Sequence, residues 1–154
     1  MFGPSFTKSD LQLATAPLTI TEAREIVWPL YDALNQPGKK DVAAPLAKAA
    51  DSDYQSYHTN EDFLTRDQLA DVFKNLGLTV PDLRWEIKDI KTIGDQVVVR
   101  GEATGTPTGE FWGAKLTGKS FKTMALDIFT LKNGKLASAY HVENWMVALQ
   151  QISK

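Results

Sequence analysis

The sequence predicts an α+β protein in which helices from the first half of the chain pack on an antiparallel sheet from the second half. Three observations support this fold class. Apolar residues recur with helical spacing in residues 19–36, the period changes to that of strands from residue 82, and the turn signal Asn133-Gly134 marks a tight hairpin near the C-terminus. With 154 residues, we expect one domain over the whole chain, beginning with an irregular arm at residues 1–17.

Two helices are predicted in the first third of the chain. A capping box at residues 19–22 begins the first helix, and its apolar stripe extends to Leu34. Pro29 is expected to kink this helix, and the turn-forming residues 36–38 to end it. A second, Ala-rich helix is predicted over residues 41–50.

A third helix is predicted from a capping box at residues 65–68, and Gly77 is expected to end it, because glycine is the usual residue just after a helix. The rest of the chain has the pattern of strands and turns. We expect a strand from residue 82, a turn at 93–96, a strand at 96–104, a Gly-rich loop at 105–118, long strands at 119–131 and 135–145, and a short C-terminal helix.

The C-terminal hairpin has a carboxylate on one strand and an imidazole on the other. Asp127 lies in an apolar segment, and His141 lies fourteen residues later. If three residues form the loop, as a type I turn with a bulge at Gly134, both side chains point to the same face of the sheet, close together. A two-residue loop would place them on opposite faces, so the hypothesis of an acid/base pair depends on one residue of register.

Composition and charge exclude several classes of function. The net charge is −2, and no Lys/Arg cluster is longer than a pair, so neither nucleic acid nor a membrane is an expected partner. The absence of cysteine excludes disulfides, thiolate metal sites and cysteine nucleophiles, and with two histidines no metal site is expected. Because no apolar run suits a signal peptide or a membrane span, we expect a cytoplasmic protein.

Three motifs resemble those of one protein family. Residues 80–87 (VPDLRWEI) resemble its "FPDLR-x-E" segment, and residues 105–119 (GTPTGEFWG…TGK) resemble its "GTHTGEF-x-G…TGK" loop. Residues 126–135 (LDIF…NGK) resemble its "IDIF…DGKI" hairpin. Because all three occur in the family's order, the chain resembles the SnoaL-like polyketide cyclases and their ester-cyclase relatives from about Tyr54 to the C-terminus, and in helix pattern over most of its length.

This resemblance implies the NTF2-like fold, a cone in which a strongly bent, mostly antiparallel sheet packs on three N-terminal helices and encloses a deep apolar pocket. It also implies a homodimer formed through the sheet and an apolar small molecule as ligand. Proteins of this fold catalyse aldol cyclisation, ketosteroid isomerisation, dehydration or epoxide hydrolysis, and others only bind ligands. The fold alone therefore does not identify the reaction.

Two departures from the family pattern concern its acid/base residues. The polyketide cyclases carry an acid/base Asp at the position of His141, and characterised cyclases can carry His at the position of Asp127. The two residue types are thus exchanged between the strands. The histidine of the family's loop is replaced by Pro107, so any role of that imidazole is lost.

The expected site residues fall into a catalytic and a ligand-binding group. Asp127 is the expected proton acceptor, and His141 or His58 is expected to stabilise the developing enolate. The expected pocket-lining residues share large aromatic or thioether side chains suited to a flat ligand: Tyr31, Tyr57, Trp85, Phe111, Trp112, Met124 and Phe129. Trp145 is expected at a dimer interface. Glu143 could orient His141, although a solvated position at the rim is the preferred interpretation.

Three functional hypotheses follow. The first is a cyclase or isomerase that uses acid/base chemistry without a cofactor on a polyketide-like carbonyl compound, with a dehydratase of the same fold as its closest rival. The second is a protein that binds an apolar small molecule without chemistry. The third is an interaction module whose cone is filled by side chains, which a cavity beside Asp127 would contradict.

Overall fold

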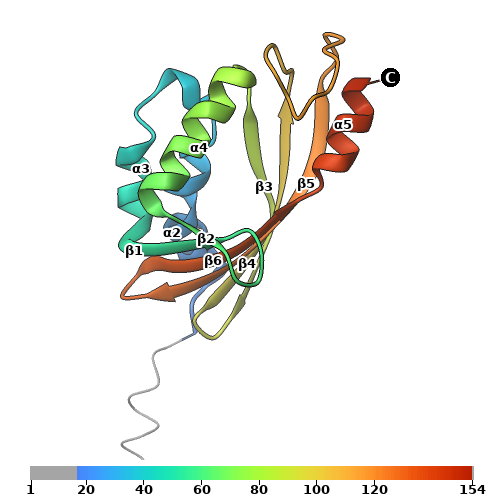
Figure 1. Cartoon of the computed structure of the whole chain (residues 1–154). Helices are drawn as coiled ribbons and strands as arrows, with labels where there is room; N and C mark the ends of the chain where they lie inside the picture. The colour runs from blue at the N-terminus through green and yellow to red at the C-terminus, as the bar shows by residue number, and fades with distance from the viewer. Residues whose placement is uncertain (1–16, 154) are drawn as a thin grey trace, which may run out of the picture.

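The computed structural model describes residues 17–153, and four α-helices and six strands lie in this part of the chain (Figure 1). The irregular arm expected at residues 1–17 falls, up to residue 16, outside the described residues. In chain order the elements are α2 (Ile20–Ala33), the 3-10 turn η1 (Pro37–Lys39), α3 (Ala43–Ala49), β1 (Ala50–Tyr57), β2 (Phe63–Thr65), α4 (Arg66–Thr79), β3 (Arg84–Ile93), β4 (Gln96–Gly105), β5 (Phe121–Lys132), β6 (Lys135–Glu143) and α5 (Trp145–Ser153).

The helices begin where the sequence predicts. The side chains of Thr19 and Thr65 each accept a hydrogen bond from the backbone N–H three residues on, which completes both capping boxes. The predicted end of the third helix is wrong, because α4 passes through Gly77 and continues to Thr79. A Cβ on Gly77 would lie 2.2 Å from the backbone nitrogen of Gly38, so glycine here allows α4 to approach η1 closely rather than ending the helix.

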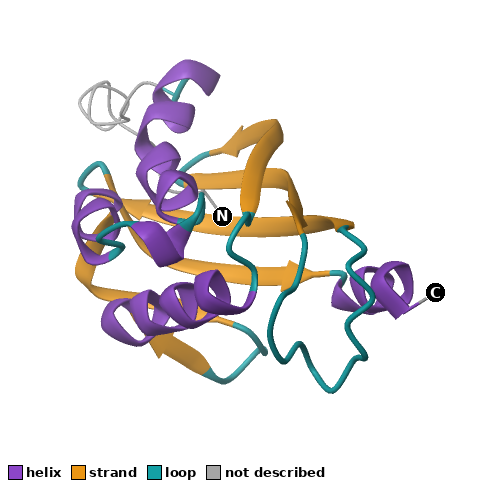
Figure 2. Cartoon of the chain, turned by 90° about the horizontal axis from the view of Figure 1, so that it is seen from above, coloured by secondary structure: helices purple, strands orange, loops and turns teal. Residues whose placement is uncertain are grey.

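The strands form one six-stranded sheet in the order β2-β1-β6-β5-β4-β3. The β1–β6 pair is parallel and the other pairs are antiparallel. The sheet bends strongly, α2, α3 and α4 cover its concave face, and α5 lies beside β5 apart from the other helices (Figures 1 and 2). This confirms the predicted α+β, NTF2-like architecture.

The two faces of the sheet differ in their side chains, as alternation along β5 shows. Phe121, Ala125 and Phe129 point toward the helices and are buried in the core. Met124 and Ile128 point to the opposite face and are 51% and 41% exposed. A residue's parity along β5 therefore decides whether it meets the enclosed interior or the outer surface.

The loop of the β5–β6 hairpin is one residue shorter than predicted. Only Asn133 and Gly134 separate the paired residues at the ends of the two strands. Both have positive φ values, 53° and 74°, as in the two-residue turns whose twist suits a hairpin. The expected three-residue loop with a bulge at Gly134 is therefore wrong.

A bulge within β6 compensates for the shorter loop. The pairing shifts by one residue between Thr130 and Leu131, which leaves Ala137 of β6 without a residue opposite it. Beyond this bulge Asp127 pairs directly with His141. Their side chains share the concave face, as the acid/base hypothesis requires, through a different element of the backbone.

Candidate active site

Asp127 and His141 are joined on the concave face of the sheet by a short hydrogen bond between Asp127 Oδ1 and His141 Nδ1. Asp127 lies in the middle of β5 and is 4% exposed, whereas the side chain of His141 on β6 is 24% exposed. The two residues come from neighbouring strands at directly paired positions, so the sheet itself fixes their separation.

Tyr31 of α2 fixes the other oxygen of Asp127. Its hydroxyl donates a hydrogen bond of 2.6 Å to Oδ2, and its ring meets Phe129 edge-on at 6.3 Å. Tyr31 was expected to line the pocket, but it lies beneath the carboxylate as a buried donor and is not among the residues that line the cavity. A carboxylate that is almost completely buried needs donors from the protein to offset the loss of its hydration.

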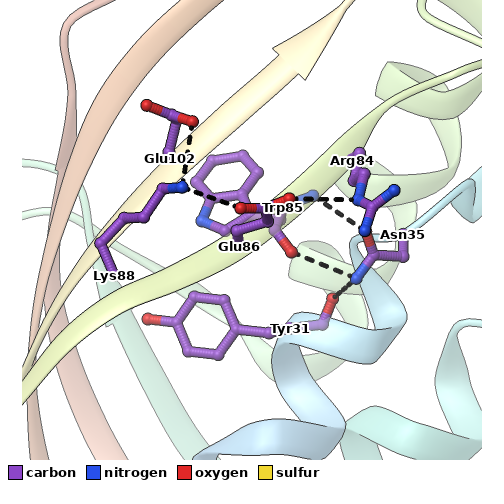
Figure 3. Close-up of polar contacts among 7 residues, drawn as sticks. All are labelled: Tyr31, Asn35, Arg84, Trp85, Glu86, Lys88 and Glu102. Atoms are coloured by element: carbon purple, nitrogen blue, oxygen red, sulfur yellow. Dashed lines mark hydrogen bonds and ion pairs between the residues drawn. The ribbon is translucent and has the colours of Figure 1, made fainter.

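Asn35 holds Tyr31 and Trp85 in place at the end of α2 (Figure 3). Its Nδ2 donates to the backbone carbonyls of Tyr31 at 3.0 Å and of Trp85 at 3.3 Å, and its Oδ1 accepts from the Trp85 backbone N–H at 2.9 Å. This side chain ties α2 to β3. The position of the Tyr31 hydroxyl thus depends on a side chain that does not itself touch the acid/base pair.

Glu143 contacts the second ring nitrogen of His141. The distance from His141 Nε2 to Glu143 Oε1 is 2.5 Å, and Trp145 Nε1 donates to Glu143 Oε2 at 3.0 Å. The preferred interpretation of Glu143 as a solvated rim residue is wrong, since its side chain is 16% exposed. Parity could have revealed this, because residues two apart on a strand point to the same face.

The electrostatics of this cluster favour a charged imidazole. Burial acts to lower the pKa of His141, but the carboxylates of Asp127 and Glu143 outweigh it and raise that pKa well above its ordinary value. Burial and the nearby Asp127 raise the pKa of Tyr31 well above its ordinary value, so its hydroxyl stays protonated and donates. At neutral pH an imidazolium therefore lies between two carboxylates, one on each ring nitrogen.

A cavity of about 210 Å³ opens beside this cluster, between the sheet and helices α2 and α4. Its lining is mainly apolar, and no Lys or Arg contributes to it: Leu30, Leu34, Tyr54, Ser56, His58, Leu64, Leu69, Val72, Phe73, Leu76, Trp112, Asp127, Phe129, His141, Glu143 and Trp145. The cone is therefore not filled by side chains, which contradicts the hypothesis of a pure interaction module.

The predicted ligand-binding residues divide between the cavity and other places. Trp112 and Phe129 line the cavity as predicted. Trp85 is buried 6.3 Å from the His141 ring, centroid to centroid, and Phe111 is buried behind Trp112 at 4.5 Å, and neither lines the cavity.

Two of the predicted lining residues lie on the opposite face of the sheet. Tyr57 stacks on Tyr140 with a centroid distance of 4.9 Å, and Met124 is 51% exposed. Both predictions are wrong because both residues have the outward parity of their strands. Tyr54 and Ser56 of β1, which the sequence analysis missed, have the inward parity and line the cavity instead.

His58 and Trp145 complete the rim of the cavity. His58 is exposed just after β1 and is among the residues that line the cavity. Trp145 was expected at a dimer interface, but it lines the cavity and packs on Trp112 with a centroid distance of 4.7 Å. Its indole N–H fixes Glu143, so this aromatic side chain belongs to the acid/base cluster.

The acidic residues around His141 do not form a metal site. Each ring nitrogen of His141 contacts a different carboxylate, so the three side chains do not converge on one point. Within residues 17–153 no group of three His, Cys, Asp or Glu side chains is arranged to hold a metal ion.

The fold is shared with solved structures of low sequence identity. TsrD from Streptomyces laurentii superposes with a TM-score of 0.74 at 18% identity, over 88% of this chain and 97% of that one. A Jannaschia sp. CCS1 protein named as a SnoaL-like polyketide cyclase gives 0.74 at 21% identity, over 90% and 95% of the two chains. A protein of ketosteroid isomerase-like fold from Catenulispora acidiphila gives 0.66 at 15% identity, over 83% and 92%. No curated protein matches the chain significantly.

The bent sheet with three helices on its concave face belongs to the NTF2 and ketosteroid isomerase-like fold class. Within that class the model of the SnoaL-like polyketide cyclases matches residues 29–152. The chain belongs to the SnoaL-like polyketide cyclase family.

None of the helices in the described part of the chain has both the length and the apolar character needed to cross a membrane. A cytoplasmic location stays a prediction.

Proposed function

We propose that this protein is a cofactor-free acid/base enzyme, a cyclase or isomerase that acts on a small, uncharged carbonyl compound. The observation that carries the proposal is the buried Asp127–His141 pair at the wall of an apolar cavity. In such chemistry a carboxylate accepts a proton from the carbon next to the carbonyl, and a nearby cation stabilises the enolate that forms. Both groups are present in fixed positions beside the cavity.

The size and charge of the cavity support the choice of ligand. Its volume of about 210 Å³ lies below the roughly 300–1,000 Å³ of sites that hold drug-sized ligands, so a ligand of one or two rings suits it. The ionised groups in its wall are Asp127, Glu143 and the imidazolium of His141, which sum to one negative charge. An anionic ligand would meet no Lys or Arg there, whereas a neutral ketone needs none.

Hydrogen–deuterium exchange of a simple ketone tests this proposal. The protein should accelerate exchange of the acidic C–H of 2-tetralone in D₂O, followed by proton NMR, by at least about 100-fold over buffer. His141→Asn should remove most of this acceleration, and His58→Asn at the rim should cost less. If 2-naphthol binds but wild-type protein does not accelerate the exchange, the protein is a binding protein and the proposal is wrong.

We also propose a homodimer that pairs through the outer face of the sheet. This face exposes large apolar side chains that neighbour one another on β5 and β6: Met124, Leu126, Ile128, Tyr140 and Val142. This apolar patch, which Arg100 and Glu102 of β4 border, is complementary to a second copy of itself, as a twofold interface requires. Light scattering should give twice the chain's mass of 17.1 kDa, and Leu126→Lys should give the monomer. A monomeric wild-type protein at micromolar concentration would contradict this pairing.

A further inference from the structure

We propose that Glu143, rather than Asp127, is the carboxylate that exchanges a proton with the ligand, while Asp127 is a positioning residue that holds His141. This inference rests on the proposed function and assigns the roles within the same site. It follows from the occupied ring nitrogens of His141, and from the exposure of the two carboxylates and the position of their partners in the fold.

His141 cannot be the proton acceptor in the resting state. Its Nδ1 is bonded to Asp127 and its Nε2 to Glu143, and a neutral ring has only one N–H to offer. Two ionised carboxylate partners therefore require two ring protons. The raised pKa of His141 agrees with this geometry. The imidazolium can stabilise negative charge but has no free lone pair.

Asp127 is held by donors from within the protein. Oδ1 accepts from His141 and Oδ2 accepts from the Tyr31 hydroxyl at 2.6 Å, and the side chain is 6% exposed. These two hydrogen bonds fix both carboxylate oxygens of Asp127 inside the protein. Its position between α2 and the sheet suits it to anchor the imidazolium.

Glu143 is the more exposed of the two carboxylates that line the cavity. Its side chain is 16% exposed, compared with 6% for Asp127, and it lies at the end of β6 beside Trp145, on the open side of the cluster. Its Oε1 lies 2.5 Å from His141 Nε2 and its Oε2 accepts from Trp145 Nε1 at 3.0 Å, and both partner residues line the cavity. Each of its oxygens keeps a second lone pair that a ligand C–H can approach.

The proton step balances with these groups alone. The C–H bond next to the ligand carbonyl breaks as an O–H bond forms on Glu143, and the bonding electrons move into the enolate. Once Glu143 is neutral, it accepts the hydrogen bond from His141 Nε2–H more weakly. This N–H is then available to donate to the enolate oxygen and to stabilise its negative charge. Return of the proton from Glu143 to the same or a conjugated carbon restores both the carboxylate and the carbonyl.

The experiment compares two isosteric substitutions in the 2-tetralone exchange assay. Glu143→Gln should lower the exchange rate by about 1,000-fold and leave the binding of 2-naphthol within about three-fold, because the amide keeps the shape but loses the base. Glu25→Gln, at an exposed position of α2, is the matched control and should leave the rate unchanged.

Asp127→Asn should change the pH dependence of the exchange rate. The groups that face His141 are Asp127 on β5, Glu143 on β6 and Tyr31 on α2, with Tyr54 of β1 close to Asp127. Removal of the Asp127 charge should lower the pKa of His141, so activity should be lost at a lower pH than in wild type. Below that pH the rate should stay within about ten-fold of wild type.

The outcomes separate this inference from the proposed function. An active wild type whose rate survives Glu143→Gln within three-fold, or falls further with Asp127→Asn than with Glu143→Gln at every pH, overturns the role of Glu143 and leaves the function standing. A wild type that does not accelerate exchange overturns both.

Discussion

Tyr31→Phe should destabilise the protein, although it removes a single oxygen atom. The substitution leaves the ring and its edge-on contact with Phe129 in place, so no large void forms. It deletes the 2.6 Å hydrogen bond to Asp127 Oδ2, which is buried between α2 and the sheet. A hydrogen bond to a charged group contributes about 1.5–3 kcal/mol, and this is the expected loss in the free energy of unfolding.

Urea unfolding followed by tryptophan fluorescence measures this loss directly. A melting experiment should show a decrease of about 3–12 °C, since about 1 kcal/mol shifts the midpoint of a domain of this size by about 2–4 °C. Tyr140→Phe is the matched control, because its hydroxyl lies on the outer face of the sheet on a side chain that is 48% exposed. It should change the free energy of unfolding by less than about 0.5 kcal/mol.

Equal stability of Tyr31→Phe and wild type, within about 0.5 kcal/mol, would refute this reasoning. It would mean that Asp127 either carries a proton of its own or obtains another donor when the hydroxyl is removed. The same result would weaken the assignment of Asp127 as a fixed anion that anchors His141.

Three further predictions concern pH, packing and the cavity rim. The folded protein raises the pKa of His141, so its ion pairs stabilise the folded state most below about pH 6.5. This contribution is lost as the pH rises through the folded pKa. The difference in unfolding free energy between wild type and His141→Asn should therefore shrink from about pH 6 to pH 9. Gly77→Ala should cost about 1–3 kcal/mol in the same urea assay, despite the better helix propensity of alanine, since its Cβ would lie 2.2 Å from the Gly38 nitrogen; a gain in stability would contradict the close contact. Trp112→Ala should weaken 2-naphthol binding about five- to ten-fold in a fluorescence titration, and unchanged affinity would place the ligand elsewhere.

Local patterns in the sequence predict most of the fold. Both capping boxes, at Thr19 and Thr65, involve residues three apart, so their chemistry is visible within one turn of helix. The predicted end of α4 is wrong because glycine is needed at position 77 for the close contact of α4 with η1, which lies about forty residues away in the sequence. Propensity describes a residue's own turn of chain and carries no information about such a distant neighbour.

The candidate site was predicted in part, and for its central pair through an incorrect loop. Asp127 and His141 are predicted to share a face if the hairpin loop has three residues; the loop has two, and the bulge at Ala137, which the sequence does not reveal, brings the pair together. Met124 was proposed as a lining residue on side-chain type alone, although it is an odd number of positions from Asp127 on the same strand. The role of Tyr31 as a donor to Asp127 could not be predicted, because it depends on how α2 crosses the sheet.

The bulge at Ala137 decides which residues of β6 face the cavity. Without the bulge, continuous pairing of all residues from the two-residue turn onward would place Tyr140, and not His141, opposite Asp127. Every later side chain of β6 would then exchange faces, so that Tyr140 and Val142 would enter the interior and His141 and Glu143 would meet solvent. Deletion of Ala137 itself would remove the bulge and still leave Ser138 opposite Thr130 and His141 opposite Asp127, so the charged cluster depends on where β6 accommodates its extra residue.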